Sequence, residues 1–184
     1  MSWEEHLFAV LDDLEHQAEG WYAAEREHEV ADLSRAEYAQ VTLASRLMAS
    51  TGATLTLDVV GLGPVSGVID RLGKGWCLLR GDSQDWVVRL AAIATVQGAA
   101  ARSVPEVAWS LVTNLGFGSA LRRLADAGER CLVQRTDGGQ HEVQLQRVGA
   151  DFVEGVEGTA RLLLFSFDVI AAVGSRDTTE RVGG

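Results

Sequence analysis

The chain has 184 residues, of which 47% are hydrophobic, and a formal net charge of −10 at pH 7. This length allows one domain or two small ones. No segment approaches the roughly 18 consecutive apolar residues that a membrane-spanning helix requires. The first residues, Met1 to Phe8, include acids where a secretion signal would be basic. We therefore expect a cytoplasmic protein that does not bind membranes.

Acidic residues are concentrated at the beginning of the chain. Residues 1–33 contain ten acidic residues and one arginine, a net charge of −9, so residues 34–184 carry only −1. An acidic segment repels the phosphate backbone of nucleic acids, and the nearly neutral remainder does not compensate for that repulsion. The charge distribution is therefore unfavourable for binding DNA.

The first part of the sequence is predicted to be helical. Residues 1–34 have the pattern of an acidic amphipathic helix, running from about 3 to about 31, and a second helix is expected at about 35–49. The segments Ser2–Glu5 and Ser34–Glu37 fit the S-x-x-E capping box, which marks a helix start. We expect the two helices to form a hairpin.

The first predicted helix carries an apolar stripe. The stripe consists of Trp3, Leu7, Val10, Leu14 and Trp21. A helical arm has no core of its own, so these side chains are predicted to contact a partner protein or a second copy of the chain. Packing on the second helix and coiled-coil dimerisation are alternatives for the same stripe.

Two segments of the sequence resemble each other. Residues 45–76 align with residues 121–152 without a gap, and apolar positions and glycines coincide. One inserted residue later, the correspondence continues with Ile93 on Ile170 and Val96 on Val173. We interpret the segments as copies of a duplicated structural unit. The ungapped part aligns Gly52 with Gly128, Gly63 with Gly139, Arg71 with Arg147, Gly73 with Gly149, and Trp76 with Phe152.

Each copy is predicted to contain five short strands. Alternating apolar and polar residues, separated by turns that contain glycine, indicate the strands. The stretches WVVRL and LLLFSF are apolar on both faces, which we attribute to bent strands that cross a small core. The strands are expected near 53–60, 65–72, 75–80, 85–90 and 93–96, and near 130–136, 141–148, 151–156, 161–167 and 170–173.

The predicted fold class is α+β, with an N-terminal helical hairpin followed by two five-stranded β-barrels, each preceded by a short helix. The expected parts are an acidic helix (1–34), a helix with the first barrel (35–98), a linker (99–117), a helix with the second barrel (118–175), and a disordered tail (176–184).

The predicted barrel unit resembles the Sm-like (SH3-type) barrel of RNA-associated ring proteins. The second signature of that family matches Trp86 to Val96, with Arg89 as the signature arginine. Leu90 stands where the signature has glycine, and Cys77 stands where the first signature has asparagine. In that family these polar residues build a uridine pocket. The resemblance therefore implies the barrel without its nucleotide-reading groups.

The whole chain also looks similar to a family of proteins from high-GC bacteria, some of which are labelled Fis-type transcriptional regulators. A DNA reader of that type needs a helix-turn-helix with a basic recognition helix. The one arginine-rich helix expected here, Ser119 to Arg130, leads into the second barrel unit. We therefore expect no DNA binding.

No motif in the sequence predicts catalysis. Cys77 and Cys131 lie in apolar, strand-like segments, which is typical of reduced core residues, and they lack CxxC spacing. The four histidines are not clustered, and the ExxH pair of Glu25 and His28 is interpreted as part of a solvated helix face, because two helices cannot supply a di-iron site. No serine or cysteine has a recognisable base nearby in the sequence. We expect a protein that is not an enzyme and that uses no metal and no cofactor.

Basic residues are the candidates for binding RNA or another anion. Either the fold gathers them on one face, or they are scattered and pair with neighbouring acids. The segment Leu115 to Arg123 contains glycines before a helix that is expected to start at the N-cap Ser119. We interpret this segment either as a pocket that binds an anion or as a turn followed by a helix cap. The five candidates are Arg71, Lys74, Arg89, Arg122 and Arg123.

The expected function is a non-enzymatic protein-interaction or assembly module with a helical docking arm. The absence of a catalytic motif, the acidic first segment and the missing nucleotide-reading residues favour this hypothesis. The alternative is an RNA-binding post-transcriptional regulator that uses an arginine-lined barrel face.

Overall fold

The computed structural model describes residues 34–175. They fall into two compact units, divided between Val41 and Thr42. In the smaller unit, residues 34–38 are helical. The predicted tail and the apolar stripe of the first helix (Trp3, Leu7, Val10, Leu14 and Trp21) lie outside the described residues.

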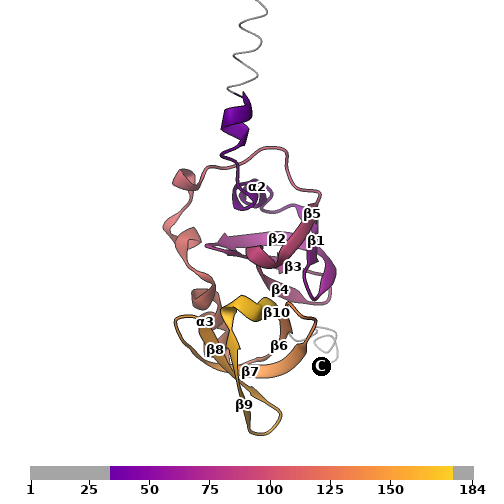
Figure 1. The fold of residues 1–184 in the computed structure, drawn as a ribbon, viewed down its shortest axis with the longest axis vertical. Helices are drawn as coiled ribbons and strands as arrows, with labels where there is room; N and C mark the ends of the chain where they lie inside the picture. The colour runs from indigo at the N-terminus through magenta and orange to yellow at the C-terminus, as the bar shows by residue number, and fades with distance from the viewer. Residues whose placement is uncertain (1–33, 176–184) are drawn as a thin grey trace, which may run out of the picture. The chain divides into compact units, whose positions relative to one another are not determined.

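The larger unit contains two helices and ten strands (Figure 1). None of the helices in residues 34–175 is long and apolar enough to cross a membrane. The first group of elements is α2 (Leu43–Ala49), β1 (Thr54–Val59), β2 (Gly63–Gly73), β3 (Trp76–Arg80), β4 (Asp85–Arg89), the 3-10 turn η1 (Leu90–Ala92) and β5 (Ile93–Gln97). After the turns η2 (Glu106–Ala108) and η3 (Leu111–Asn114) come α3 (Phe117–Ala127), β6 (Arg130–Arg135), β7 (Gln140–Val148), β8 (Phe152–Glu157), β9 (Arg161–Ser166), η4 (Phe167–Val169) and β10 (Ile170–Ser175).

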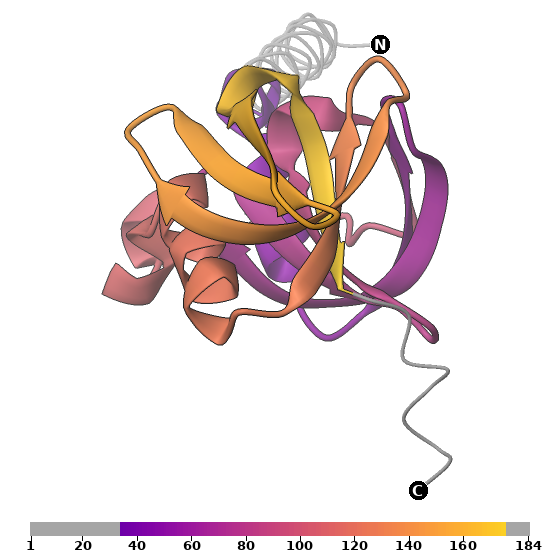
Figure 2. The same cartoon turned by 90° about the horizontal axis from the view of Figure 1, so that it is seen from below.

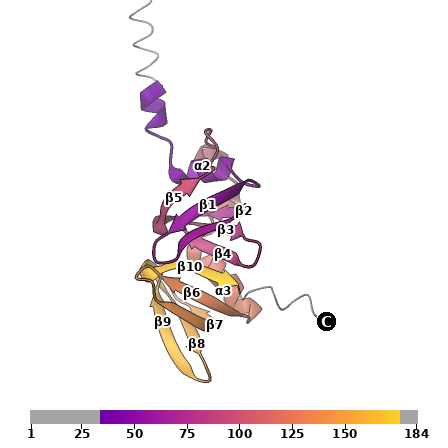
Figure 3. The ribbon, with the colours of Figure 1, turned by 90° about the vertical axis from the view of Figure 1, so that its right-hand side faces the viewer.

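All ten strands form one sheet, so the prediction of two separate five-stranded barrels is wrong. The strand order is β5-β1-β2-β3-β4-β10-β6-β7-β8-β9. At its centre β4 pairs antiparallel with β10, with Val88 opposite Ala172 and Val87 opposite Val173; Figure 3 shows the two strands side by side. The pairing satisfies backbone N–H and C=O groups that a separate first barrel would leave free along β4.

Apolar side chains also cross between the two parts of the sheet. We call residues 43–97 the first half and residues 117–175 the second half; Figure 2 shows the second half, orange to yellow, in front of the first. Ala171 and Ala172 of β10 belong to the buried cluster of the first half. Trp76 and Val87 belong to the buried cluster of the second half. Each half takes side chains from the other into its core, which explains why the halves do not form independent barrels.

The strand order is the same in the two halves. It is β5-β1-β2-β3-β4 in the first and β10-β6-β7-β8-β9 in the second. In both halves one 3-10 turn, η1 or η4, joins the last two strands in the sequence. The predicted positions of all ten strands are confirmed. The duplication that would explain this correspondence stays a prediction.

The predicted hairpin arm at 35–49 is not one helix, and this part of the fold prediction is also wrong. Residues 34–38 are helical, and α2 starts separately after its N-cap, Thr42. Thr42 and Ser45 form a reciprocal capping box in which each backbone N–H donates to the other side-chain hydroxyl at 3.1 Å. This cap stabilises a new helix start. The predicted cap, Ser34, is itself helical.

The segment between the halves packs on the first half. The Val104 N–H donates to the Ser45 carbonyl at 2.9 Å. The Arg46 guanidinium donates to the Ala100 carbonyl at 2.7 Å. These bonds hold the segment against α2, and they also occupy the guanidinium of Arg46.

Candidate binding sites

One hollow lies where α3 faces strands β2, β3 and β4. We call it the arginine groove; its volume is about 630 Å³. Apolar side chains and charged side chains both line it. The apolar set is Trp76, Leu78, Val87, Leu115, Ala120 and Leu124, and the polar set is Asp70, Arg71, Arg80, Ser119, Arg122, Arg123 and Asp126.

The indole of Trp76 is held in this groove by a hydrogen bond to the segment before α3. Its Nε1 donates to the Leu115 carbonyl at 2.9 Å, and the Lys74 N–H donates to the same carbonyl at 3.0 Å. Gly73 lies directly under the indole, where a Cβ would overlap the ring. The glycine therefore lets the indole lie flat on the strand, and Trp76 is only 8% exposed.

Helix α3 supplies the other wall of the groove. Its N-cap is Gly116, which makes no side-chain cap bond, so the prediction that Ser119 caps this helix is wrong. Leu121 is fully buried in the second-half core. Arg122 and Arg123 follow it on the exposed side of the helix. Burial of Leu121 thus fixes the side of α3 from which the two arginine side chains extend.

The charges of the groove are only partly paired. Arg80 forms an ion pair with Asp70 at 3.2 Å. Within residues 34–175, no carboxylate lies within ion-pair distance of Arg71, Arg122 or Arg123. The groove therefore combines an apolar surface with three arginines that have no acidic partner in the described part of the chain.

The structure brings together three of the five predicted basic candidates: Arg71, Arg122 and Arg123 line the arginine groove. Lys74 is exposed and does not line it. Arg89 is held between the two halves instead. Its guanidinium donates to the carbonyls of Phe167 and Ile170 and lies 5.8 Å from the centre of the Phe117 ring.

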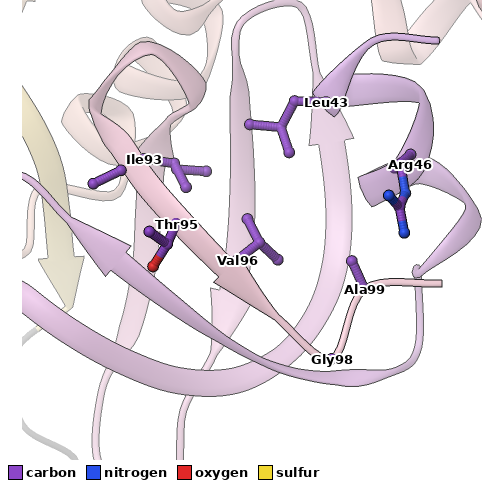
Figure 4. A pocket seen from close by; sticks show the side chains of 8 residues that line it. Leu43, Arg46, Ile93, Thr95, Val96, Gly98 and Ala99 are labelled. Carbon is purple, nitrogen blue, oxygen red and sulfur yellow. The ribbon is translucent and has the colours of Figure 1, made fainter. Parts of the chain in front are cut away.

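A second hollow lies between α2 and the outer side of β5, and we call it the β5 groove (Figure 4). Its volume is about 310 Å³. Leu43 of α2 is 42% exposed at this groove. This groove could not be predicted from the sequence, because it depends on which edge of β5 lacks a neighbouring strand. The groove is lined by Leu43, Arg46, Ile93, Ala94, Thr95, Val96, Gly98 and Ala99.

The two cysteines are core residues, as predicted. Both thiols are free and buried. Burial raises the pKa of each thiol to about 12, because a buried thiolate loses its hydration. Neither cysteine is therefore an ionised nucleophile near neutral pH. Residues 34–175 contain no group of three or more His, Cys, Asp or Glu side chains placed to hold a metal ion.

Models of known protein families give no match to the sequence. A comparison with curated proteins gives no match either. The resemblance to Sm-like proteins and the Fis-type label therefore stay hypotheses. The features of the molecule that bear on its function are the two grooves and the sheet.

Proposed function

We propose that the protein is a non-enzymatic interaction module that binds an acidic, partly apolar segment of a partner protein in the arginine groove. The observation that carries this proposal is the combination of apolar surface with three arginines that lack acidic partners among the described residues. Guanidinium groups form bidentate hydrogen bonds with carboxylates, and the apolar wall provides area to bury.

The lining of the groove suits a peptide segment that carries both apolar and acidic side chains. Its apolar residues come from β3, β4, α3 and the segment before α3, whereas Arg71 lies near the end of β2 and Arg122 and Arg123 lie on α3. Peptide segments bind grooves of this kind through a few apolar anchors and surrounding charges. Glutamate or aspartate beside leucine or an aromatic residue would satisfy both parts.

Single-stranded RNA is the second candidate. It is favoured by the same gathering of Arg71, Arg122 and Arg123, and by Trp76, an aromatic ring beside them. The net charge of −10 disfavours it, because long-range repulsion weakens binding to a polyanion. Trp76 is also only 8% exposed, which leaves little ring face for stacking a base.

The proposal has two further parts. The first concerns residues outside the described part of the chain: we propose that the stripe of Trp3, Leu7, Val10, Leu14 and Trp21 is a docking arm for a partner protein or for a second copy. The second is a cytoplasmic location, which we propose because reduced cysteines are usual there.

The arginine groove is tested by reversing two of its charges. The probe is a fluorescein-labelled peptide of alternating glutamate and leucine, about ten residues long, titrated with the full chain in a fluorescence anisotropy assay. We expect the double variant Arg122→Glu/Arg123→Glu to raise the peptide Kd about tenfold or more, since attraction becomes repulsion at two positions.

A matched control separates the groove from net charge. Arg102→Glu/Arg130→Glu changes the net charge equally at two exposed arginines that do not line the groove, and it should leave the Kd within about twofold. Equal losses in both double variants, or no binding of the peptide, would contradict the proposal. Tighter binding of a labelled oligouridine than of the peptide, lost in the groove variant, would establish RNA as the ligand instead.

A further inference from the structure

The two outermost strands of the sheet each have a free edge. Among the strands of residues 34–175, β5 pairs only with β1, and β9 pairs only with β8. Free edges expose backbone N–H and C=O groups that can pair with another chain. The β9 edge has an additional feature: Leu162 is 54% exposed and Leu164 is 65% exposed.

The pairing of β4 with β10 inside the chain shows how an edge of this kind pairs with another strand. Because the two halves share one strand order, β9 occupies in the second half the position that β4 occupies in the first. By the same comparison, β5 corresponds to β10. The chain therefore carries one completed junction, β4 with β10, and the two corresponding strands, β9 and β5, as free edges.

The corresponding positions differ in burial. Both β4 and β9 end where a 3-10 turn begins, at Leu90 and at Phe167. Counting back from these turns places Leu164 at the position of Val87. Val87 lies opposite Val173 in the junction and is 8% exposed, whereas Leu164 is 65% exposed. An apolar residue thus stands uncovered where the internal junction covers one.

We propose that copies of this chain associate head to tail, with β9 of one copy paired antiparallel to β5 of the next. The register follows from the internal junction, where Ala172, Val173 and Gly174 lie opposite Val88, Val87 and Trp86. Transferred to the free edges, Thr95 lies opposite Phe165 and Val96 lies opposite Leu164. This inference goes beyond the proposed peptide binding and does not depend on it.

The β5 groove supports a second copy as the occupant of this edge. In the internal junction, Val87 of β4 and Arg122 of α3 line the same groove. Arg122 aligns with Arg46 of α2, and Arg46 lines the β5 groove together with Val96. Leu164 of an incoming β9 would therefore lie over the β5 groove, where Leu43 is also exposed.

The two contacting surfaces are different, so the association is heterologous. Such contacts produce a closed ring when the rotation between copies completes a circle, and an open filament when it does not. Each copy would contribute ten strands to one continuous sheet. A pair held by two identical edges, β9 with β9 or β5 with β5, is excluded by the proposal.

Analytical ultracentrifugation of the full chain tests the proposal. The wild type should sediment as species larger than a monomer, in a concentration-dependent manner, at concentrations up to about 200 µM. Leu164→Asp should block the β9 edge, and Leu43→Asp/Thr95→Asp should block the β5 edge, so each variant should be monomeric. Val107→Asp replaces an apolar residue of η2 that is 97% exposed and does not line the β5 groove, and it should sediment as the wild type does.

Mixing the two blocked variants gives the sharpest outcome. Leu164→Asp retains an intact β5 edge, and Leu43→Asp/Thr95→Asp retains an intact β9 edge. An equimolar mixture should therefore form dimers that grow no further. Circular dichroism establishes that each variant is folded. The proposal is overturned if the wild type is monomeric or if the mixture stays monomeric. It is also overturned if Leu164→Asp associates as the wild type does, which would indicate association through another surface, such as the N-terminal stripe.

Discussion

Replacing Val87 by aspartate is expected to lower the free energy of unfolding by about 4 kcal/mol, because a charged carboxylate would replace an apolar side chain in the buried cluster of the second half. Val87 lies between Leu78 of β3 and Val173 of β10 and is 8% exposed. Urea denaturation followed by tryptophan fluorescence measures the loss. Trp86 in the buried cluster of the first half and Trp76 in that of the second half report on unfolding.

The matched control is Leu164→Asp at the corresponding position of β9. Leu164 is 65% exposed, so its replacement should change the stability of the monomer by no more than about 0.5 kcal/mol. The comparison is made at protein concentrations low enough to keep the chain monomeric. If Val87→Asp costs as little as Leu164→Asp, β4 is an edge strand and the two halves are not joined there.

Gly61→Ala is expected to be the more damaging of two alanine substitutions in one turn. Gly61 has φ = 78°, and a Cβ there would overlap the Arg135 carbonyl oxygen and lie 2.9 Å from the Thr136 oxygen. These are backbone atoms at the end of β6 and the start of the following turn, so they cannot move aside like a flexible side chain. The Gly61 carbonyl also accepts a hydrogen bond from Gln134 Nε2 at 2.6 Å.

Gly63→Ala separates the overlap from the cost of the backbone conformation. Gly63 has φ = 87°, and a Cβ there meets nothing within 4 Å. Its substitution should cost about 1 kcal/mol for the left-handed conformation alone. Gly61→Ala should cost that amount and about 2 kcal/mol more, for the overlap. Equal losses in urea denaturation would show that this turn does not pack on the second half.

The strands could be predicted from the sequence because their signals are local. Alternation of apolar and polar residues and glycines at turns depend on a few neighbouring residues, and the structure confirms all ten strands. The pairing of β4 with β10 joins residues more than 80 positions apart, for example Val88 with Ala172. No local pattern specifies such a pairing.

The sequence did contain one sign of the joined sheet. The stretch WVVRL is apolar on both faces, a pattern that by itself indicates a bent barrel strand. In the structure Trp86, Val87 and Val88 are buried because β4 lies between β3 and β10. The stretch LLLFSF has the same pattern, yet two of its leucines are exposed at the β9 edge. The difference between these two strands motivates the proposed association.

The candidate sites could be predicted only in part. Charge alone predicts Arg71, Arg122 and Arg123 as candidates, and the fold gathers them at one groove. Charge predicts Arg89 equally, but its guanidinium bonds to two carbonyls across the junction. Charge alone does not distinguish a binding arginine from one that holds two elements together, because that depends on which carbonyls the fold places nearby.

The most direct test of the joined sheet is a measurement of contacts between β4 and β10 by nuclear Overhauser spectroscopy. The structure places Val87 opposite Val173 and Val88 opposite Ala172. The spectra are recorded on the Leu164→Asp variant, at a concentration at which it is monomeric, so that contacts between copies do not contribute. We expect cross-strand backbone contacts between these residues. Absence of these contacts, with β4 amides exchanging with solvent as fast as those of β9, would contradict a single ten-stranded sheet.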